Sequence, residues 1–129
     1  MKPNNTIELF DIAEISSNKG NSTFRIGLNQ QREGLLGYRT AGTTFGGHWH
    51  EGKSTSKNPE TVYLLQGVME LRTKHIDQKE ETITQLRAPI GVKIWPEIWH
   101  QLYAITDVCF VELNSLEEHI ADTKYPNSK

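Results

Sequence analysis

The stretch GGHWHEGKSTSKNPETVYLLQG, residues 46–67, contains the feature on which the interpretation of this sequence depends. His48 and His50 lie one residue apart, and Glu60 follows a polar segment at the start of an apolar run. Side chains two residues apart on a β-strand point to the same side, because the strand repeats every two residues. We therefore expect His48 and His50 to share one face of a strand, with Trp49 on the opposite face.

The sequence on either side of this stretch predicts short β-strands separated by turns. Segments rich in Gly, Asn, Ser and Asp alternate with short runs of Val, Ile, Leu, Tyr, Thr and Phe. The runs are STFRIGL, GLLGYRTA, TVYLLQ, VMELRT, TITQL, GVKIW, HQLYAI and VCFVEL. Strands at this spacing are typical of antiparallel sandwiches and barrels. The pair Gln66-Gly67 between two runs predicts a tight hairpin.

A helix is expected only near the ends of the chain. In NSLEEHIADT, Ser115 precedes Glu118 by three residues, which is the signature of a capping box. We therefore expect a short C-terminal helix. Residues 7–15 contain apolar residues of mixed period, and this pattern does not decide between helix and strand.

Length, charge and cysteine content narrow the class of protein. The 129 residues suit one domain, so we expect 1–129 to form a single unit. Lys and Arg total 14 against 16 Asp and Glu, without a basic block, which indicates that neither nucleic acid nor an anionic membrane is a partner. No apolar run approaches the ~20 residues of a membrane span. The start of the chain lacks the features of a signal peptide, so a cytoplasmic location is expected. The single cysteine, Cys109, is expected to be a buried, reduced thiol.

Three histidines and one glutamate are candidate metal ligands. Glu60 begins an apolar run, and a neighbouring antiparallel strand would bring it close to His48 and His50. His100 begins another strand-like run far downstream. Three imidazoles and a carboxylate that converge on an apolar interior suit a divalent transition metal, with Mn, Fe, Ni, Zn and Cu all acceptable. The alternative is that the histidine pair is merely half-exposed and polar.

The spacing of glycines around these residues resembles the first motif of the cupins. That motif reads G-x5-H-x-H, three or four residues, then E-x6-G. Gly42 precedes His48 at the required offset, and Gly67 follows Glu60 at the required offset. The nine residues between His50 and Glu60 are five or six more than usual.

The second cupin motif, G-x5-P-x-G-x2-H-x3-N, is degraded in this chain. Its histidine corresponds to His100. Its other positions hold Pro89 (with Gly91 nearby), Trp95 (followed by Pro96), Glu97 and Ala104. The resemblance covers about residues 36–114. It implies an all-β jelly-roll barrel with a site inside its open mouth, the ligand set His48, His50, Glu60 and His100, and often a homodimer.

The remaining polar and aromatic candidates have simpler interpretations. His75 is expected in a solvated turn, and His119 is expected to complement the dipole of the C-terminal helix. Lys53 and Lys57 are expected in a solvated loop, although they could meet an anionic substrate at the barrel mouth. Four aromatic residues could line a pocket, but such residues more often fill a core or a dimer interface: Tyr38, Tyr63, Trp99 and Tyr103.

The candidate residues and the resemblance are compatible with three alternative functions. The first is a mononuclear metal site that binds or transforms a small molecule. The second is metal-free isomerisation or epimerisation of a nucleotide-linked sugar, with His48 or His50 as the general base and a tyrosine as the acid. The third is a non-catalytic domain that binds a small molecule. The sequence does not decide whether the protein is an enzyme.

Overall fold

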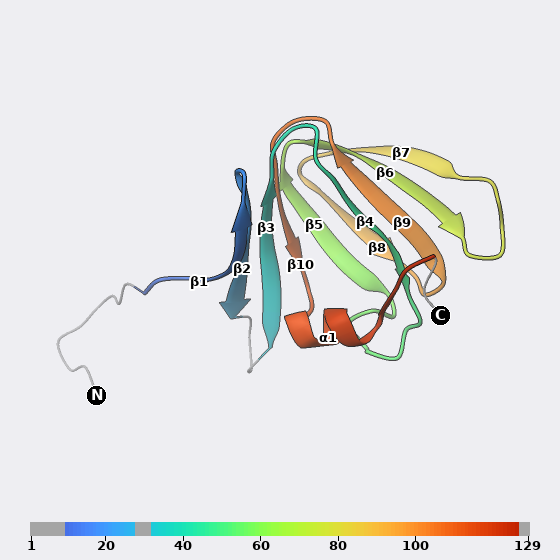
Figure 1. The fold of residues 1–129 in the computed structure, drawn as a ribbon, viewed down its shortest axis with the longest axis horizontal. Coiled ribbons are helices and arrows are strands. Elements are labelled where there is room, and N and C mark those ends of the chain that lie inside the picture. Colours follow the sequence, from blue (N-terminus) through green and yellow to red (C-terminus); the bar gives the residue numbers. More distant parts are fainter. Residues whose placement is uncertain (1–9, 28–31, 127–129) are drawn as a thin grey trace.

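The computed structural model describes residues 10–27 and 32–126 and shows two antiparallel β-sheets facing each other (Figure 1). One sheet has the order β1-β2-β3-β10-β5-β8, formed by Ala13–Asn18, Asn21–Gly27, Glu33–Arg39, Val108–Glu112, Glu60–Gln66 and Ile90–Ile94. The other has the order β11-β4-β9-β6-β7, formed by Thr123–Lys124, Thr44–His50, Ile98–Ala104, Val68–His75 and Thr82–Arg87. The predicted all-β jelly-roll fold is confirmed.

The core lies between the two sheets because each strand turns alternate residues inward. On β5, Val62 and Leu64 are buried while Tyr63 between them is exposed. The buried cluster draws on both sheets and consists of Val62, Leu64, Met69, Leu71, Leu86, Ile94, Leu102, Ala104, Val108 and Phe110. Cys109 is a buried free thiol, as expected.

The predicted hairpin at Gln66-Gly67 is wrong. The strands on either side of it, β5 and β6, belong to different sheets, so the turn carries the chain across the barrel. The glycine is nevertheless required there. Gly67 has φ +96°, and a Cβ at this position would lie 2.2 Å from the carbonyl oxygen of Asp107.

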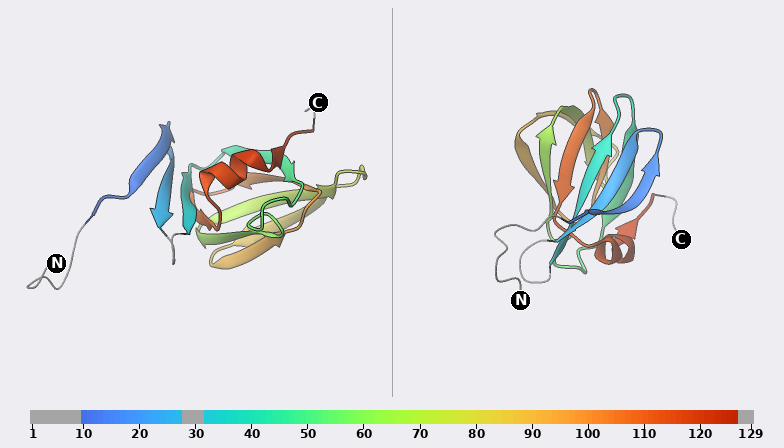
Figure 2. Two further views of the ribbon diagram at one scale, coloured as in Figure 1. Left: turned by 90° about the horizontal axis from the view of Figure 1, so that it is seen from below. Right: turned by 90° about the vertical axis from the view of Figure 1, so that its left-hand side faces the viewer.

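The C-terminal helix α1 (Leu116–Ala121) forms where the capping signature predicts it. The backbone N–H of Glu118 donates to Ser115 Oγ at 3.1 Å, and the Ser115 N–H donates back to the Glu118 carboxylate. Seen from below, the helix crosses one end of the barrel (Figure 2), and β11 then pairs with the end of β4.

The ambiguous N-terminal segment contains the start of a strand and no helix among its described residues, and residues 10–12 belong to neither. Ala13–Asn18 form β1, and residues 7–9 lie outside the described residues. Among residues 10–27 and 32–126, no helix has both the length and the apolar character needed to cross a membrane.

Candidate metal centre

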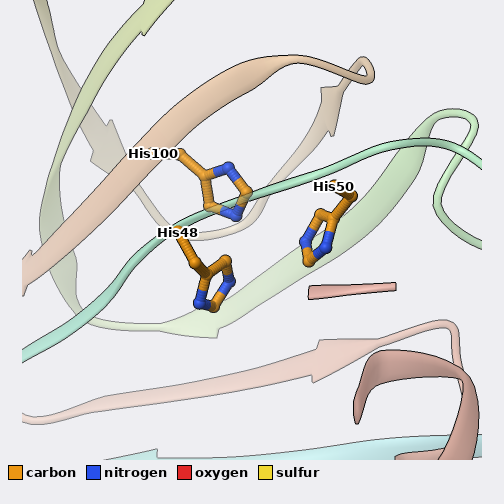
Figure 3. A group of neighbouring side chains, drawn as sticks. All are labelled: His48, His50 and His100. Atoms are coloured by element: carbon orange, nitrogen blue, oxygen red, sulfur yellow. The ribbon is translucent and has the colours of Figure 1, made fainter. Parts of the chain in front are cut away.

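Neighbouring strands β4 and β9 bring three of the predicted ligands together. His48 and His100 are direct cross-strand partners, and a bulge at Gly46-Gly47, both with positive φ, precedes His48. The rings of His48, His50 and His100 form one group (Figure 3), with centroids 4.8–5.2 Å apart. All three side chains are buried, whereas Trp49 is half-buried on the other face, as expected.

Glu60 reaches the histidines from the opposite sheet. Its Oε2 lies 2.8 Å from His50 Nε2, and its Oε1 lies 3.5 Å from His100 Nε2. The expectation that a neighbouring strand would carry Glu60 is wrong, because β5 pairs with β8 and β10 and not with β4. The carboxylate approaches across the barrel interior instead, and all four predicted ligands meet there.

A fourth imidazole, from His119 on α1, joins this group. Its ring centroid lies 5.3 Å from that of His48 and 5.7 Å from that of His50. Two sets of ligand atoms lie within 4.8 Å of one another, namely His48, His50 and His100, and His50, Glu60 and His119. The sequence interpretation of His119 as a helix-dipole residue was incomplete, because nothing in the local pattern shows that α1 lies against the barrel mouth.

Lys57 is also part of the centre, and its assignment to a solvated loop is wrong. Its side chain is fully buried, and Nζ donates to Glu60 Oε2 at 2.5 Å, to Asn114 Oδ1 at 3.0 Å and to His119 Nδ1 at 3.0 Å. Three acceptors therefore match the three N–H groups of the ammonium. Lys53, by contrast, is exposed as expected.

Two of the histidines have a buried ring nitrogen without a partner. His50 Nδ1 donates to the carbonyl of Asp122 and His100 Nδ1 to that of Ile98, both at 3.0 Å. In a neutral imidazole with a protonated Nδ1, Nε2 carries a lone pair. Within the described part of the chain, both Nε2 atoms are buried and make no hydrogen bond; Glu60 Oε2 lies 2.8 Å from His50 Nε2, but a carboxylate oxygen has no proton to donate to a lone pair. Unpaired buried acceptors among imidazoles fit a metal ion, and backbone carbonyls on the opposite ring nitrogens are the usual support for such ligands.

The electrostatics of the centre favour the protonation states that bind metals. Burial, followed by the charges of His100, His50 and His119, lowers the pKa of His48 to about 3. Burial and the charge of Lys57 lower the pKa of His119 to about 4, and burial also lowers that of His100. Burial alone would raise the pKa of Glu60, but contact with His50 and the charge of Lys57 outweigh it, and the pKa lies well below its usual range. Neutral imidazoles and an ionised carboxylate are the forms that coordinate metals.

A cavity of about 130 Å³ adjoins the histidines inside the barrel. It is lined by Arg39, Phe45, Gly46, His48, Glu60, Val62, Met69, His100, Leu102, Phe110, Glu112 and His119. Burial and the charge of Glu60 raise the pKa of Glu112 to about 7. A larger hollow of about 840 Å³ contains none of the histidines; three of its charged residues, Arg25, Glu33 and Glu117, pair with one another.

The other sequence candidates lie outside this cavity. His75 is partly exposed beside Asp77 and Glu97, as expected, but it is the last residue of β6, paired with Ile98, and not part of a turn. None of the four candidate aromatic residues lines the cavity: Tyr38, Tyr63, Trp99 and Tyr103.

Comparison with known proteins finds similarity in structure. No protein-family model matches the sequence, and no curated protein matches it. CapF, the capsular polysaccharide assembling protein of Staphylococcus aureus, is similar with a TM-score of 0.73 and 17% identity over 91% of this chain. The cupin domain of CENP-C from Drosophila melanogaster gives a TM-score of 0.62 and 9% identity over 81% of this chain and 76% of that chain.

An oxalate decarboxylase from Bacillus subtilis gives a TM-score of 0.62 and 12% identity over 79% of this chain. This chain spans only 34% of CapF and 26% of the decarboxylase. At these identities the likeness establishes the fold alone.

Proposed function

This chain has the cupin fold, and we propose that its histidine cluster binds one divalent transition-metal ion. The ligands are His48, His50, His100 and Glu60. The observation that carries the proposal is the pair of buried, unpaired Nε2 atoms of His50 and His100, which have lone pairs and no hydrogen bond among the described residues. Leaving such groups unpaired costs free energy that a bound cation offsets.

Other residues of the chain hold the ligands in place. The carbonyls of Asp122 and Ile98 select the tautomers of His50 and His100. Lys57 keeps Glu60 ionised and restricts its orientation. A bound divalent metal supplies Lewis acidity toward an oxygen ligand, and Mn, Fe, Ni, Zn and Cu all suit this donor set. The metal and the cavity beside it together bind a small molecule.

Elemental analysis of protein purified without an affinity tag tests the proposal. We expect about one metal ion per chain. The variant His100→Ala should bind the metal at least about tenfold more weakly, which corresponds to ~1.4 kcal/mol, while His75→Ala, at the partly exposed end of β6, should bind it normally. Protein that is metal-free and takes up none of Mn, Fe, Ni or Zn would refute the proposal.

Metal-free sugar chemistry is the second candidate, because CapF is a capsular polysaccharide assembling protein. Two observations weigh against it. The cavity of about 130 Å³ is smaller than the roughly 300–1,000 Å³ of sites for drug-sized ligands, and a nucleotide-linked sugar is larger still. Lys57, which could have met a diphosphate, is buried against Glu60.

We also propose that the chain is a single domain, acts in the cytoplasm and forms a homodimer. The outer face of the six-stranded sheet supports the dimer. The strand register puts apolar and aromatic side chains on that face, among them Phe24, Leu36, Tyr38, Tyr63, Leu65 and Val111. Tyr38, Tyr63 and Leu65 are each more than 40% exposed, and a second copy would cover them.

A further inference from the structure

The cavity beside the histidines contains a cation that the metal centre does not use. Arg39, on β3, lines the cavity, and its guanidinium carbon lies 5.3 Å from the ring centres of both Phe45 and Phe110. Nη1 donates to the carbonyls of Ser22 and Tyr38, and Nη2 donates to a threonine hydroxyl. These bonds account for three of the five N–H groups. Nε–H and one Nη2–H make no hydrogen bond to any described residue.

The charges around the cavity leave an excess of positive charge. The carboxylate of Glu60 is paired with Lys57, so neither contributes a net charge. Glu112, with its pKa raised to about 7, is only partly ionised there and compensates Arg39 incompletely. A divalent metal adds two further positive charges, and a half-buried, low-dielectric site strengthens the attraction of an anion.

The apolar part of the cavity lining favours a small organic anion. They are apolar and aromatic, and consist of Phe45, Val62, Met69, Leu102 and Phe110. Such walls favour a carbon skeleton over a hydrated inorganic ion. The fork of an arginine matches the two oxygens of a carboxylate. The aromatic rings hold that fork in one orientation, which reduces the entropy lost on binding.

We infer that this cavity binds a small carboxylate anion, with its carboxylate group on Arg39 and its other end toward the histidines. The inference rests on the proposed metal site for part of the positive charge, but Arg39 and the apolar walls belong to the chain itself. The small molecule is then a carboxylate, and Arg39 recognises it.

Calorimetric titration of metal-loaded protein with matched pairs of ligands tests the inference. The probes are acetate, propionate, butyrate and pyruvate, each compared with its neutral amide, together with inorganic phosphate. We expect at least one carboxylate to bind ten times or more tightly than its amide and more tightly than phosphate. Equal binding of every acid and amide, no binding of any carboxylate, or a preference for phosphate would overturn the inference.

The variant Arg39→Gln, which keeps a polar group but loses the charged fork, should abolish the preference for the acid over the amide. Arg87→Gln, on the exposed face of β7, is the matched control and should keep it. A thermal melt checks that each variant is folded, and Arg39→Lys should retain part of the preference if Arg39→Gln does not fold. If Arg39→Gln is folded and still prefers the acid over its amide, Arg39 does not bind the carboxylate.

The same titration of metal-free protein separates this inference from the metal proposal. If the protein takes up no metal but still prefers the acid over its amide, and Arg39→Gln abolishes this preference, the carboxylate site is sustained and the metal centre is refuted. Metal uptake without any preference for a carboxylate would sustain the metal centre and refute the carboxylate site.

Discussion

Lys57 and Glu60 form an ion pair that is almost completely removed from water, with exposed side-chain fractions of 0% and 4%. Burying both charges is costly, and the pair is tolerated because every N–H of the ammonium has an acceptor. Each partner therefore depends on the other. The loop before β5, the start of β5 and helix α1 all meet at this one ammonium group, so a single residue joins three parts of the site.

Removal of Lys57 should destabilise the protein strongly. In Lys57→Met the carboxylate of Glu60 remains buried without its main cation, so we expect the free energy of unfolding of metal-free protein to fall by about 3–5 kcal/mol. Urea denaturation measures this change. Lys53→Met, on the exposed side of the same loop, should change it by less than about 0.5 kcal/mol.

The double variant Lys57→Met/Glu60→Gln removes both charges and should recover much of the loss. A single variant as stable as the parent protein would show that the ion pair does not form in solution.

At the scale of elements, the C-terminal segment made of α1, Asp122 and β11 lies across the barrel end, and we call this segment the strap. Asp122, directly after α1, accepts hydrogen bonds from the backbone N–H groups of Glu51, Gly52 and Ser54 through its buried carboxylate. Its own carbonyl accepts from His50 Nδ1. The strap therefore holds the loop after β4 and orients a candidate ligand at the same time.

Loss of the Asp122 carboxylate should release the strap. In Asp122→Ala three backbone N–H groups lose their acceptor, and we expect the segment to be destabilised by about 3 kcal/mol, because each buried unpaired donor costs about 1–3 kcal/mol and water satisfies some of them. Hydrogen exchange at Glu51, Gly52 and Ser54 and limited proteolysis after Asn114 should both become faster.

Asp107→Ala is the matched control for this variant. The Asp107 carboxylate accepts one hydrogen bond, from the exposed N–H of Ala41, so its loss should leave the C-terminal segment protected. Unchanged exchange in Asp122→Ala would contradict the role of the strap.

Across the whole molecule, the buried titratable groups make stability depend on pH. The pKa values of His48 and His119 are lowered from 6.5 to about 3 and about 4, so the unfolded chain binds more protons below pH 6.5. Their contribution is present above pH 6.5 and is lost as the pH falls through the folded values. The lowered pKa of Glu60 acts in the same direction below pH 4.5. Glu112 acts in the opposite direction, since its raised pKa contributes stability that is lost as the pH rises through about 7.

We therefore expect metal-free protein to be most stable near neutral pH. Its free energy of unfolding should fall by on the order of 2 kcal/mol between pH 6.5 and pH 4, as measured by denaturant titrations across this range. His119→Gln should reduce the decline, whereas His75→Gln should leave it unchanged. A flat profile from pH 4 to pH 8 would contradict the burial of neutral histidines.

The homodimer is a second prediction at this scale. Light scattering at micromolar concentration should give about twice the 14.7 kDa of one chain. Tyr63→Lys with Leu65→Lys should lower the mass to that of one chain, because two charges would be buried in the interface. Ile83→Lys, exposed on the other sheet, should leave the dimer intact. A parent protein of 14.7 kDa would contradict the prediction.

Several features of this protein could be predicted from residues that lie close together in the sequence. The two-residue repeat of a strand put His48 and His50 on one face, and the Ser115–Glu118 pair predicted the start of α1. Turn residues between β-forming runs predicted the all-β class, and the offsets of Gly42 and Gly67 around the ligands predicted the jelly roll through resemblance. Each of these depends on residues near one another in the chain, or on a motif that preserves such spacing.

Only the tertiary structure determined which segments meet. Gln66-Gly67 has the composition of a hairpin, yet the adjoining strands enter different sheets because each pairs with more distant partners. His119 and Lys57 have the patterns of a helix end and a solvated loop, yet both become buried once α1 and the loop lie across the barrel end. The contacts that bring α1 and this loop together join residues 57 to 62 positions apart in the chain, as in Lys57–Asn114 and Lys57–His119. Contacts between residues so far apart produce no repeating pattern in the local sequence. Only the folded chain therefore shows that the site contains four histidines and a buried ammonium group.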